Sequence, residues 1–147
     1  KAVTILAACE LGKRRQASDI EKRLNLNSAI SIYNYMYPKV QDKDIEEAWI
    51  LLLNQKLDLI EAKCISHGGI TGTAIDIRII LKEALLRNAT AIALCHNHPS
   101  GNPRPSREDD NITNSLKKAA DTMHIYFVDH VIVAQQHFYS YREEGKI

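Results

Sequence analysis

Short apolar segments recur along the later two-thirds of the chain and predict buried β-strands. Residues 48–53 (AWILLL) are apolar throughout and lie between charged and polar residues, which is typical of a strand buried on both faces. Residues 59–66 follow after a turn near 55–58, so the two segments are expected to form a hairpin. The complete set of expected strands is 48–53, 59–66, 91–95, 125–134 and 138–141.

Apolar residues at helical spacing lie between these strands. At 76–88, Ile80 and Ala84 fall on one helix face, and Asn88 is the expected stop. Residues 106–122 carry a second apolar face. The resulting order of strand, strand, helix, strand, helix, strand, strand predicts an α/β domain with a mixed β-sheet flanked by helices.

The first forty residues have less regular patterns. Residues 1–11 are expected to form a short helix that ends at Gly12, because glycine tolerates the left-handed cap conformation and the basic residues after it suit a helix C-terminus. Two more helical stretches are expected at 18–26 and 28–37, and the second should end at Pro38.

The length of the chain bounds its domain organisation. A chain of 147 residues, 45% of them hydrophobic, has the size of one compact domain, since single domains most often contain about 100–150 residues. Because the chain begins with Lys1 rather than Met, we expect residues 1–25 to be an N-terminal helical arm or linker from a longer protein. Residues 26–147 are expected to form the domain.

Charge and cysteine content limit the classes of function. Nineteen basic and eighteen acidic residues leave a net charge of +1, which does not support nucleic-acid binding, because such domains typically have a pI above about 9. The cysteines Cys9, Cys64 and Cys95 form no C-x-x-C pair, which argues against a disulfide framework and favours a reducing compartment. Without a signal-peptide pattern or an apolar run of about 18 residues, a cytoplasmic protein without a membrane partner is expected.

Two histidines and an aspartate form the most informative group in the sequence. His96 and His98 follow the third expected strand, where side chains two residues apart point the same way, about 6.5–7 Å from each other. One zinc ion with bonds of about 2.0–2.1 Å to each nitrogen can bridge them after modest adjustment. Pro99 and Gly101 then turn the chain, which lets the next helix bring Asp109 back. Three protein ligands leave a fourth position for water, so a catalytic type of site with one zinc per chain is expected.

Ser106 and Asp109 also have a structural interpretation. A serine N-cap followed three residues later by an acidic residue resembles a capping box at a helix start. Capping explains neither the histidines nor the turn, and a helix N-terminus also keeps a carboxylate ionised for metal binding. We therefore expect Asp109 to serve both purposes.

The remaining histidines and cysteines suggest less chemistry. His130, after Asp129, is either an outer hydrogen-bond partner of the metal site or, more simply, a structural histidine at a strand start. Cys95 adjoins His96 but should face the other side of the strand, which favours burial over metal binding. His67 has no partner at ligand spacing and is expected at the surface or in the core.

A longer pattern surrounds the histidines. Residues 96–109 (HNHPSGNPRPSRED) resemble the JAMM motif of MPN-type metalloproteases and are most similar to its RadC-like bacterial branch. The segments EEAWILLLN, GGITGT, IDIRIILKEAL and VDHVIV are similar to the same branch, so the resemblance covers about residues 40–147. The initial part, with ELGKRR, resembles the linker that precedes that domain. The resemblance implies a JAB/MPN-like fold with a cytidine-deaminase-like layout.

The resemblance also implies roles for single residues. His96, His98 and Asp109 would be the zinc ligands, and Ser106 would assist the water or the developing oxyanion. The base would be a glutamate at the start of the first core strand, a position that Glu46 matches.

The assignment of the base leaves alternatives open. Glu47 is the alternative by register, Glu61 in the second strand is a weaker candidate, and Glu46 with Glu47 would otherwise be a solvated pair in front of a strand. Hydrolysis of an amide bond by zinc-bound water requires such a base, whether or not the resemblance holds. Zinc lowers the pKa of its water towards about 7, but a carboxylate must take the proton and deliver it to the leaving amine.

These residues favour a zinc-dependent metallopeptidase or isopeptidase that acts on a peptide or protein substrate. A nucleobase deaminase is disfavoured because its H-x-E and P-C-x-x-C patterns are missing. The rival hypothesis is a non-catalytic or DNA-repair-associated zinc-binding module, which the RadC resemblance suggests and the net charge does not support.

Overall fold

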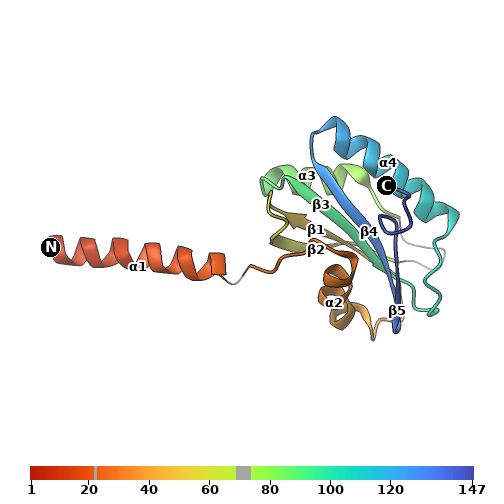
Figure 1. The fold of residues 1–147 in the computed structure, drawn as a ribbon, viewed down its shortest axis with the longest axis horizontal. Coiled ribbons are helices and arrows are strands. Elements are labelled where there is room, and N and C mark those ends of the chain that lie inside the picture. The colour runs from red at the N-terminus through yellow and green to blue at the C-terminus, as the bar shows by residue number, and fades with distance from the viewer. Residues whose placement is uncertain (22, 69–73) are drawn as a thin grey trace.

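The computed structural model describes residues 1–21, 23–68 and 74–147 (Figure 1). The described residues form four helices and five strands. Of the glycines in the segment GGITGT, Gly68 is described, whereas Gly69 and Gly72 lie outside the described residues. The elements are α1 (Ala2–Glu21), α2 (Ala29–Val40), β1 (Glu47–Leu53), β2 (Leu59–His67), α3 (Ile77–Leu86), β3 (Ala91–Asn97), α4 (Arg107–Thr122), β4 (Tyr126–Ala134) and β5 (His137–Ser140).

The five strands form one mixed sheet in the order β2-β1-β3-β4-β5. The β1–β2 hairpin is antiparallel as expected, and β1 also pairs antiparallel with β3. Only β3 and β4 are parallel, because the helix α4 returns the chain to the starting edge of the sheet. The predicted α/β domain with a mixed sheet is confirmed.

Helices cover both faces of this sheet, so the domain has three layers (Figure 1). On one face, Ile32 and Met36 of α2 pack against Leu51 of β1. On the other face, Ile80 of α3 and Leu116 of α4 pack against a second set of strand residues. The central strands are buried from both sides, which explains their continuously apolar sequences.

The register between β1 and β3 positions the chemistry. Ala48 lies opposite His96 in the antiparallel pair, so the start of β1 is next to the end of β3. Cys95 packs in the α2-side core, and burial raises the pKa of its thiol. His96 therefore faces the side of the sheet covered by α3 and α4, as the alternation of a strand requires.

The predicted end of the first helix at Gly12 is wrong. Helix α1 continues to Glu21, and Gly12 does not have the positive φ of a cap. A glycine inside a helix costs only about 1 kcal/mol relative to alanine, so it weakens the helix without ending it. The described residues include no helix long and apolar enough to cross a membrane.

Two further boundaries differ from the expectation. The stretch at 24–26 is extended rather than helical, because backbone hydrogen bonds join it to the β1–β2 turn: Leu26 N donates to Leu57 O at 2.8 Å, and Leu59 N donates to Leu24 O at 2.8 Å. Helix α2 passes through Pro38 to Val40. Pro38 has no N–H to donate, so the helix loses one hydrogen bond there, but the chain stays helical and Gln41 N still donates to Tyr37 O at 2.9 Å.

Candidate metal centre

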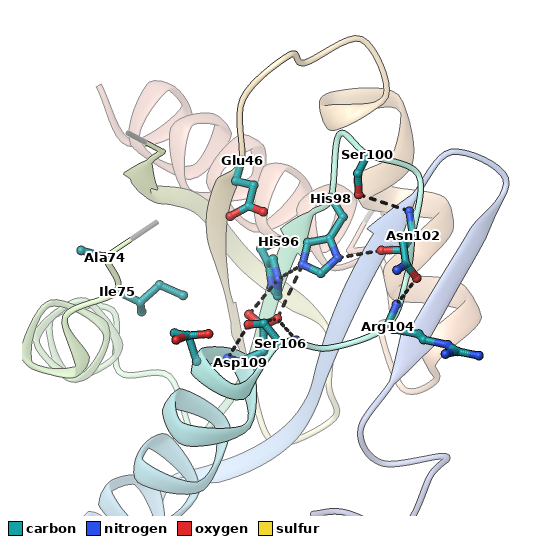
Figure 2. A pocket seen from close by; sticks show the side chains of 11 residues that line it. Glu46, Ala74, Ile75, His96, His98, Ser100, Asn102, Arg104, Ser106 and Asp109 are labelled. Carbon is teal, nitrogen blue, oxygen red and sulfur yellow. Dashed lines mark hydrogen bonds and ion pairs between the residues drawn. The ribbon is translucent and has the colours of Figure 1, made fainter. Parts of the chain in front are cut away.

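The structure brings His96, His98 and Asp109 together at one point (Figure 2). His96 lies in β3 and is only 3% exposed, His98 follows the strand, and Asp109 lies in the first turn of α4. The Nε2 atoms of the two histidines are 3.0 Å apart. Asp109 Oδ1 lies 3.1 Å from His96 Nε2, and its Oδ2 lies 3.6 Å from His98 Nε2. The three donors therefore face a common position.

The loop after β3 has a specific conformation that holds His98. The His98 N–H donates to Val133 O at 2.8 Å, which extends the pairing with β4 by one residue. Gly101 then turns the chain with a φ of 78° and donates its N–H to His98 O at 3.0 Å. A side chain at this position would be strained by the positive φ and would meet Gln135 at 3.3 Å. The predicted turn after the histidines is confirmed.

Ser106 and Asp109 form the expected capping box at the start of α4. The Asp109 N–H donates to Ser106 Oγ at 3.1 Å, and the Ser106 N–H donates back to Asp109 Oδ2 at 2.7 Å. The Ser106 hydroxyl also donates to Oδ2, at 2.8 Å. These contacts hold Oδ2 and leave Oδ1 directed at His96.

The environment of Asp109 favours the ionised carboxylate. Burial by itself raises the pKa of this carboxyl, but interactions with His96, His98 and the Ser106 N–H outweigh burial and hold the pKa well below its usual value. For His98, burial lowers the pKa, whereas Asp109 and the carbonyl of Asn102 raise it, and the net shift is upward. A metal ion at this point takes the place of the imidazole proton.

The outer hydrogen bonds of the two histidines assign their tautomers. His98 Nδ1 lies 2.8 Å from Asn102 O, which only accepts, so Nδ1 carries the hydrogen. His96 Nδ1 lies 2.8 Å from His130 Nε2. With hydrogens on both Nδ1 atoms, the two Nε2 atoms, which face the Asp109 carboxylate, are the atoms that would bind a metal ion, as in metal-ligating histidines.

A buried chain of hydrogen bonds continues behind His96. His130 Nδ1 lies 2.6 Å from Thr113 Oγ1, and the Thr113 hydroxyl donates to Asp109 O at 2.6 Å. All donors in this chain can point the same way, from His96 through His130 and Thr113 to the backbone of Asp109. Burial lowers the pKa of His130 well below its usual value, so this imidazole is neutral. These hydrogen bonds link two of the three candidate ligands, His96 and Asp109.

The sequence favoured a structural histidine at position 130 over an outer partner of the candidate metal site, but the geometry makes His130 a hydrogen-bond partner of His96. Asp129 does not take part, because it faces Ser140 Oγ at 2.6 Å and Arg142 N at 3.0 Å. Thr113 was missed altogether. A histidine inside the apolar run VDHVIV was the available signal for His130, whereas a threonine on a helix is too common to attract attention.

Glu46 and Glu47 point to opposite faces of the sheet. Ala48 pairs with His96, and side chains two residues apart share a face, so Glu46 is on the side of His96. Figure 2 shows its carboxylate turned towards the two imidazoles, in a cavity of about 600 Å³ that also includes Ser106 and Asp109. Glu47 is on the other side. Its Oε2 accepts from Trp49 Nε1 at 3.1 Å, and its Oε1 lies 3.3 Å from Lys43 Nζ.

The third acidic candidate lies away from the cavity. Glu61 in β2 forms an ion pair with Arg87 near the end of α3. Its position excludes direct contact with the histidines. The arrangement thus brings together Glu46, Ser106 and the three candidate ligands, and leaves out Glu47 and Glu61.

The donor set fits a zinc ion. Two imidazole nitrogens and a carboxylate oxygen are common zinc ligands, and in a tetrahedral site with bonds of about 2.0–2.1 Å such donors lie about 3.3 Å apart. Here the two Nε2 atoms are 3.0 Å apart, and the Asp109 carboxylate approaches His96 with Oδ1 at 3.1 Å and His98 with Oδ2 at 3.6 Å. A three-layer α/β domain with this donor set, taken from a strand end and a helix start, has the features of a metal-binding domain in which three protein ligands would leave a fourth position for water.

The chain belongs to the RadC-like JAB domain family, whose family model matches residues 26–146. It is 40% identical to a UPF0758 protein of Flavobacterium johnsoniae over 99% of this chain and 63% of the relative. It is 38% identical to a UPF0758 protein of Symbiobacterium thermophilum over 99% of this chain and 62% of the relative. A UPF0758 protein of Porphyromonas gingivalis is 37% identical, with 64% of its length matched.

The chain spans less than two-thirds of the length of these relatives. Membership of the family and the group His96, His98 and Asp109 together support a candidate metal site in this domain.

Proposed function

We propose that this domain is a zinc-dependent metallopeptidase or isopeptidase that hydrolyses an amide bond in a peptide or protein substrate. One observation carries the proposal: the carboxylate of Glu46 faces the three candidate ligands across the same cavity. A purely structural zinc site is usually closed by four protein ligands, and it needs no carboxylate poised beside it.

His96, His98 and Asp109 would hold the ion. When bound, zinc supplies a Lewis acid and lowers the pKa of water to about 7. The hydrogen bonds of the ligands to Asn102 and His130 would orient the two imidazoles throughout the reaction.

Glu46 would act as the general base and then as the general acid. Its carboxylate accepts a proton from the attacking water as the oxygen bonds to the carbonyl carbon of the substrate. It then delivers the same proton to the amide nitrogen as the carbon–nitrogen bond breaks, so the products are an amine and a carboxylic acid, which releases its proton to water. Such proton transfer contributes typically about 10²–10⁴-fold to a rate.

Ser106 would stabilise the oxyanion that develops on the substrate carbonyl. Its hydroxyl donates to Asp109 Oδ2 in the structure, so donation to a substrate requires that the hydroxyl turn away from this carboxylate. The Ser106 N–H keeps Oδ2 occupied when this happens. The backbone cap therefore holds Asp109 while the hydroxyl changes partner.

The test is the variant Glu46→Gln, assayed for zinc content and for cleavage of a peptide library. We expect zinc at this centre to be retained and the rate to fall by about 10²-fold or more, since the amide has no proton-accepting carboxylate. His96→Ala and Asp109→Ala should lose both zinc at this centre and activity. Glu61→Gln is the matched control, because Glu61 is paired with Arg87 away from the cavity, and it should keep both.

Three results would contradict the proposal: full activity in Glu46→Gln, loss of zinc from that variant, or no cleavage by the zinc-loaded unsubstituted chain. The last result would favour the non-catalytic alternative.

A further inference from the structure

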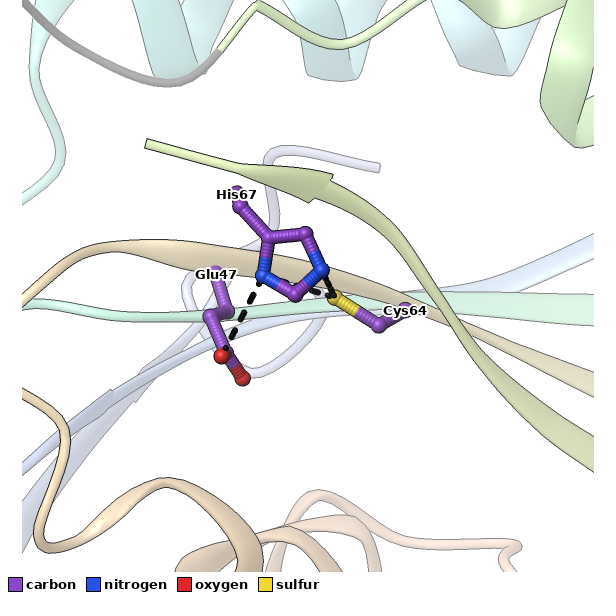
Figure 3. Close-up of side chains that lie close together, drawn as sticks. All are labelled: Glu47, Cys64 and His67. Carbon is purple, nitrogen blue, oxygen red and sulfur yellow. Dashed lines mark hydrogen bonds and ion pairs between the residues drawn. The ribbon is translucent and has the colours of Figure 1, made fainter. Parts of the chain in front are cut away.

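A second group of metal-ligating side chains lies at the open end of the β1–β2 hairpin (Figure 3). It consists of Glu47, Cys64 and His67, and one donor atom from each lies within 4.8 Å of the other two. Figure 3 shows the His67 ring between the Glu47 carboxylate and the Cys64 sulfur. Nothing in the proposed hydrolysis uses these residues.

A β-bulge is what brings Cys64 and His67 to the same side. Residues three apart in a regular strand point to opposite faces. Here Ala48 pairs with Ser66 but Trp49 pairs with Cys64, so the register shifts by one residue between them. The extra residue re-aims the side chains beyond it. Cys64 thereby joins His67, which lies directly opposite Glu47.

Two of the three donor separations match those of zinc ligands, and the third, between Glu47 and Cys64, is within 4.8 Å. His67 Nδ1 lies 3.3 Å from Glu47 Oε1 and 3.8 Å from Cys64 Sγ. In a tetrahedral zinc site, bonds of about 2.0–2.1 Å to nitrogen or oxygen and about 2.3 Å to sulfur place nitrogen about 3.3 Å from oxygen and about 3.6 Å from sulfur. The observed distances agree with both values to within a few tenths of an ångström.

The carboxylate of this group is preorganised. Glu47 is only 3% exposed, and a buried carboxylate needs compensating partners. Its Oε2 accepts from Trp49 Nε1 at 3.1 Å, which leaves Oε1 directed at His67. Lys43 Nζ also lies 3.3 Å from Oε1, but its side chain is 47% exposed, so it can turn into solvent when a cation takes its place.

A nucleophilic cysteine activated by a histidine is the competing interpretation of this group. Burial and the nearby Glu47 carboxylate raise the pKa of the Cys64 thiol, whereas reactive cysteines have a lowered pKa in an electropositive setting. The Glu47 carboxylate disfavours a free thiolate at Cys64. The same carboxylate supplies the third ligand for a metal ion.

We propose that Glu47, Cys64 and His67 form a second metal site, which binds Zn²⁺ through one oxygen, one sulfur and one nitrogen and clamps the start of β1 to the end of β2. The mixed donor set with a thiolate selects zinc and similar transition metals over magnesium or calcium. The proposed second site adjoins Glu46, because Glu47 follows it in the sequence and Gly68, which follows His67, donates its N–H to Glu46 O at 2.6 Å. The binding of this ion does not depend on the proposed hydrolysis.

The test uses Co²⁺ as a spectroscopic substitute for zinc in the whole chain. A thiolate ligand to Co²⁺ gives an intense charge-transfer band in the near ultraviolet, and the centre at His96 contains no sulfur, so the band reports the second site alone. We expect the band in the unsubstituted chain, with two metal equivalents bound. In His96→Ala one equivalent should be lost and the band kept.

The matched pair of variants is Cys64→Ser and Cys9→Ser. Cys64→Ser should lose the band and one equivalent, whereas Cys9→Ser should keep both, because Cys9 is exposed on α1. His67→Gln should weaken binding at this site by more than the roughly 10–100-fold typical when only an outer partner of a ligand is changed.

A measurement without substitutions guards against variants that do not fold. In the unsubstituted chain, added Zn²⁺ should protect Cys64 from alkylation and leave the alkylation rate of Cys9 unchanged, as followed by peptide mass spectrometry. Absence of the near-ultraviolet band in the unsubstituted chain, its persistence in a folded Cys64→Ser protein, or unprotected Cys64 would overturn the second site. None of these results bears on Glu46→Gln, so the two proposals fail separately.

Discussion

At the scale of single residues, the orientation of His96 depends on His130 and Thr113, which are not candidate metal ligands themselves. Its Nδ1–H has one partner, His130, which is fully buried and stacks on Tyr141 with the ring planes 4° apart. The stack on Tyr141 and the bond to Thr113 both hold the His130 ring in this orientation. The orientation of the His96 ring is therefore set by His130 and Thr113, which lie behind it and are not candidate ligands.

We predict that His130→Phe weakens zinc binding at the His96 centre by about 10–100-fold, the usual effect of losing an outer partner of a ligand. Phenylalanine keeps the stack on Tyr141 but cannot accept from His96 Nδ1–H. Affinity is measured by competition with a chromogenic chelator. Thr113→Val, one link further along the chain, should have a smaller effect. Unchanged affinity in a folded His130→Phe protein would show that His96 needs no such partner.

At the scale of elements, α4 delivers Asp109 because its first turn is capped. The capping box fixes where the helix begins, and Asp109 is the third residue of that helix. Three acidic residues in the first turn, Glu108, Asp109 and Asp110, also interact favourably with the positive end of the helix dipole. The same local rule that starts the helix thus orients the carboxylate.

For Ser106→Ala we predict a loss of about 1 kcal/mol in the free energy of unfolding, within the usual range of about 0.5–2 kcal/mol for a lost N-cap. Zinc affinity should fall as well, because Asp109 Oδ2 loses the hydroxyl contact. Asp76→Ala removes the N-cap of α3 and is the control: it should destabilise the fold without changing zinc affinity. Denaturant unfolding and chelator competition separate the two effects, and equal zinc affinities in both variants would contradict this account.

The strands and later helices could be predicted from the sequence because their signals are local. Each expected strand overlaps an observed one, and α3 and α4 begin next to the residues that cap them. The early helices were less predictable. The 24–26 segment is extended because it pairs with the β1–β2 turn, a contact between segments that local periodicity does not report.

At the scale of the whole molecule, Leu26 is the first buried side chain among those whose burial is described. Leu26 is fully buried and belongs to the core under α2, whereas residues 1–12 of α1 are exposed. In Figure 1, α1 projects away from the layers around the sheet. Helices of this kind gain little from packing, so the stability of the domain resides in the three layers.

Removal of residues 1–21 is accordingly predicted to leave the free energy of unfolding and the zinc content of residues 22–147 nearly unchanged. Leu26→Ala in the whole chain is the contrast and should cost about 2–5 kcal/mol, as expected when a fully buried leucine is truncated. Denaturant unfolding checks both. A large loss of stability on removal of 1–21 would mean that α1 contributes to the core.

The sequence by itself determined the features that depend on neighbouring residues: the buried strands, the turn at Gly101, the capped start of α4, and the approach of His96, His98 and Asp109. These residues lie within one strand–turn–helix segment, where strand alternation and helix capping are sufficient to orient side chains. Only the tertiary structure decided which face Glu46 and Glu47 occupy, that His130 and Thr113 support His96, and that a bulge gathers Glu47, Cys64 and His67. The physical reason is that strand register and bulges arise from pairing between distant segments, and a shift of one residue moves a side chain to the other face of the sheet.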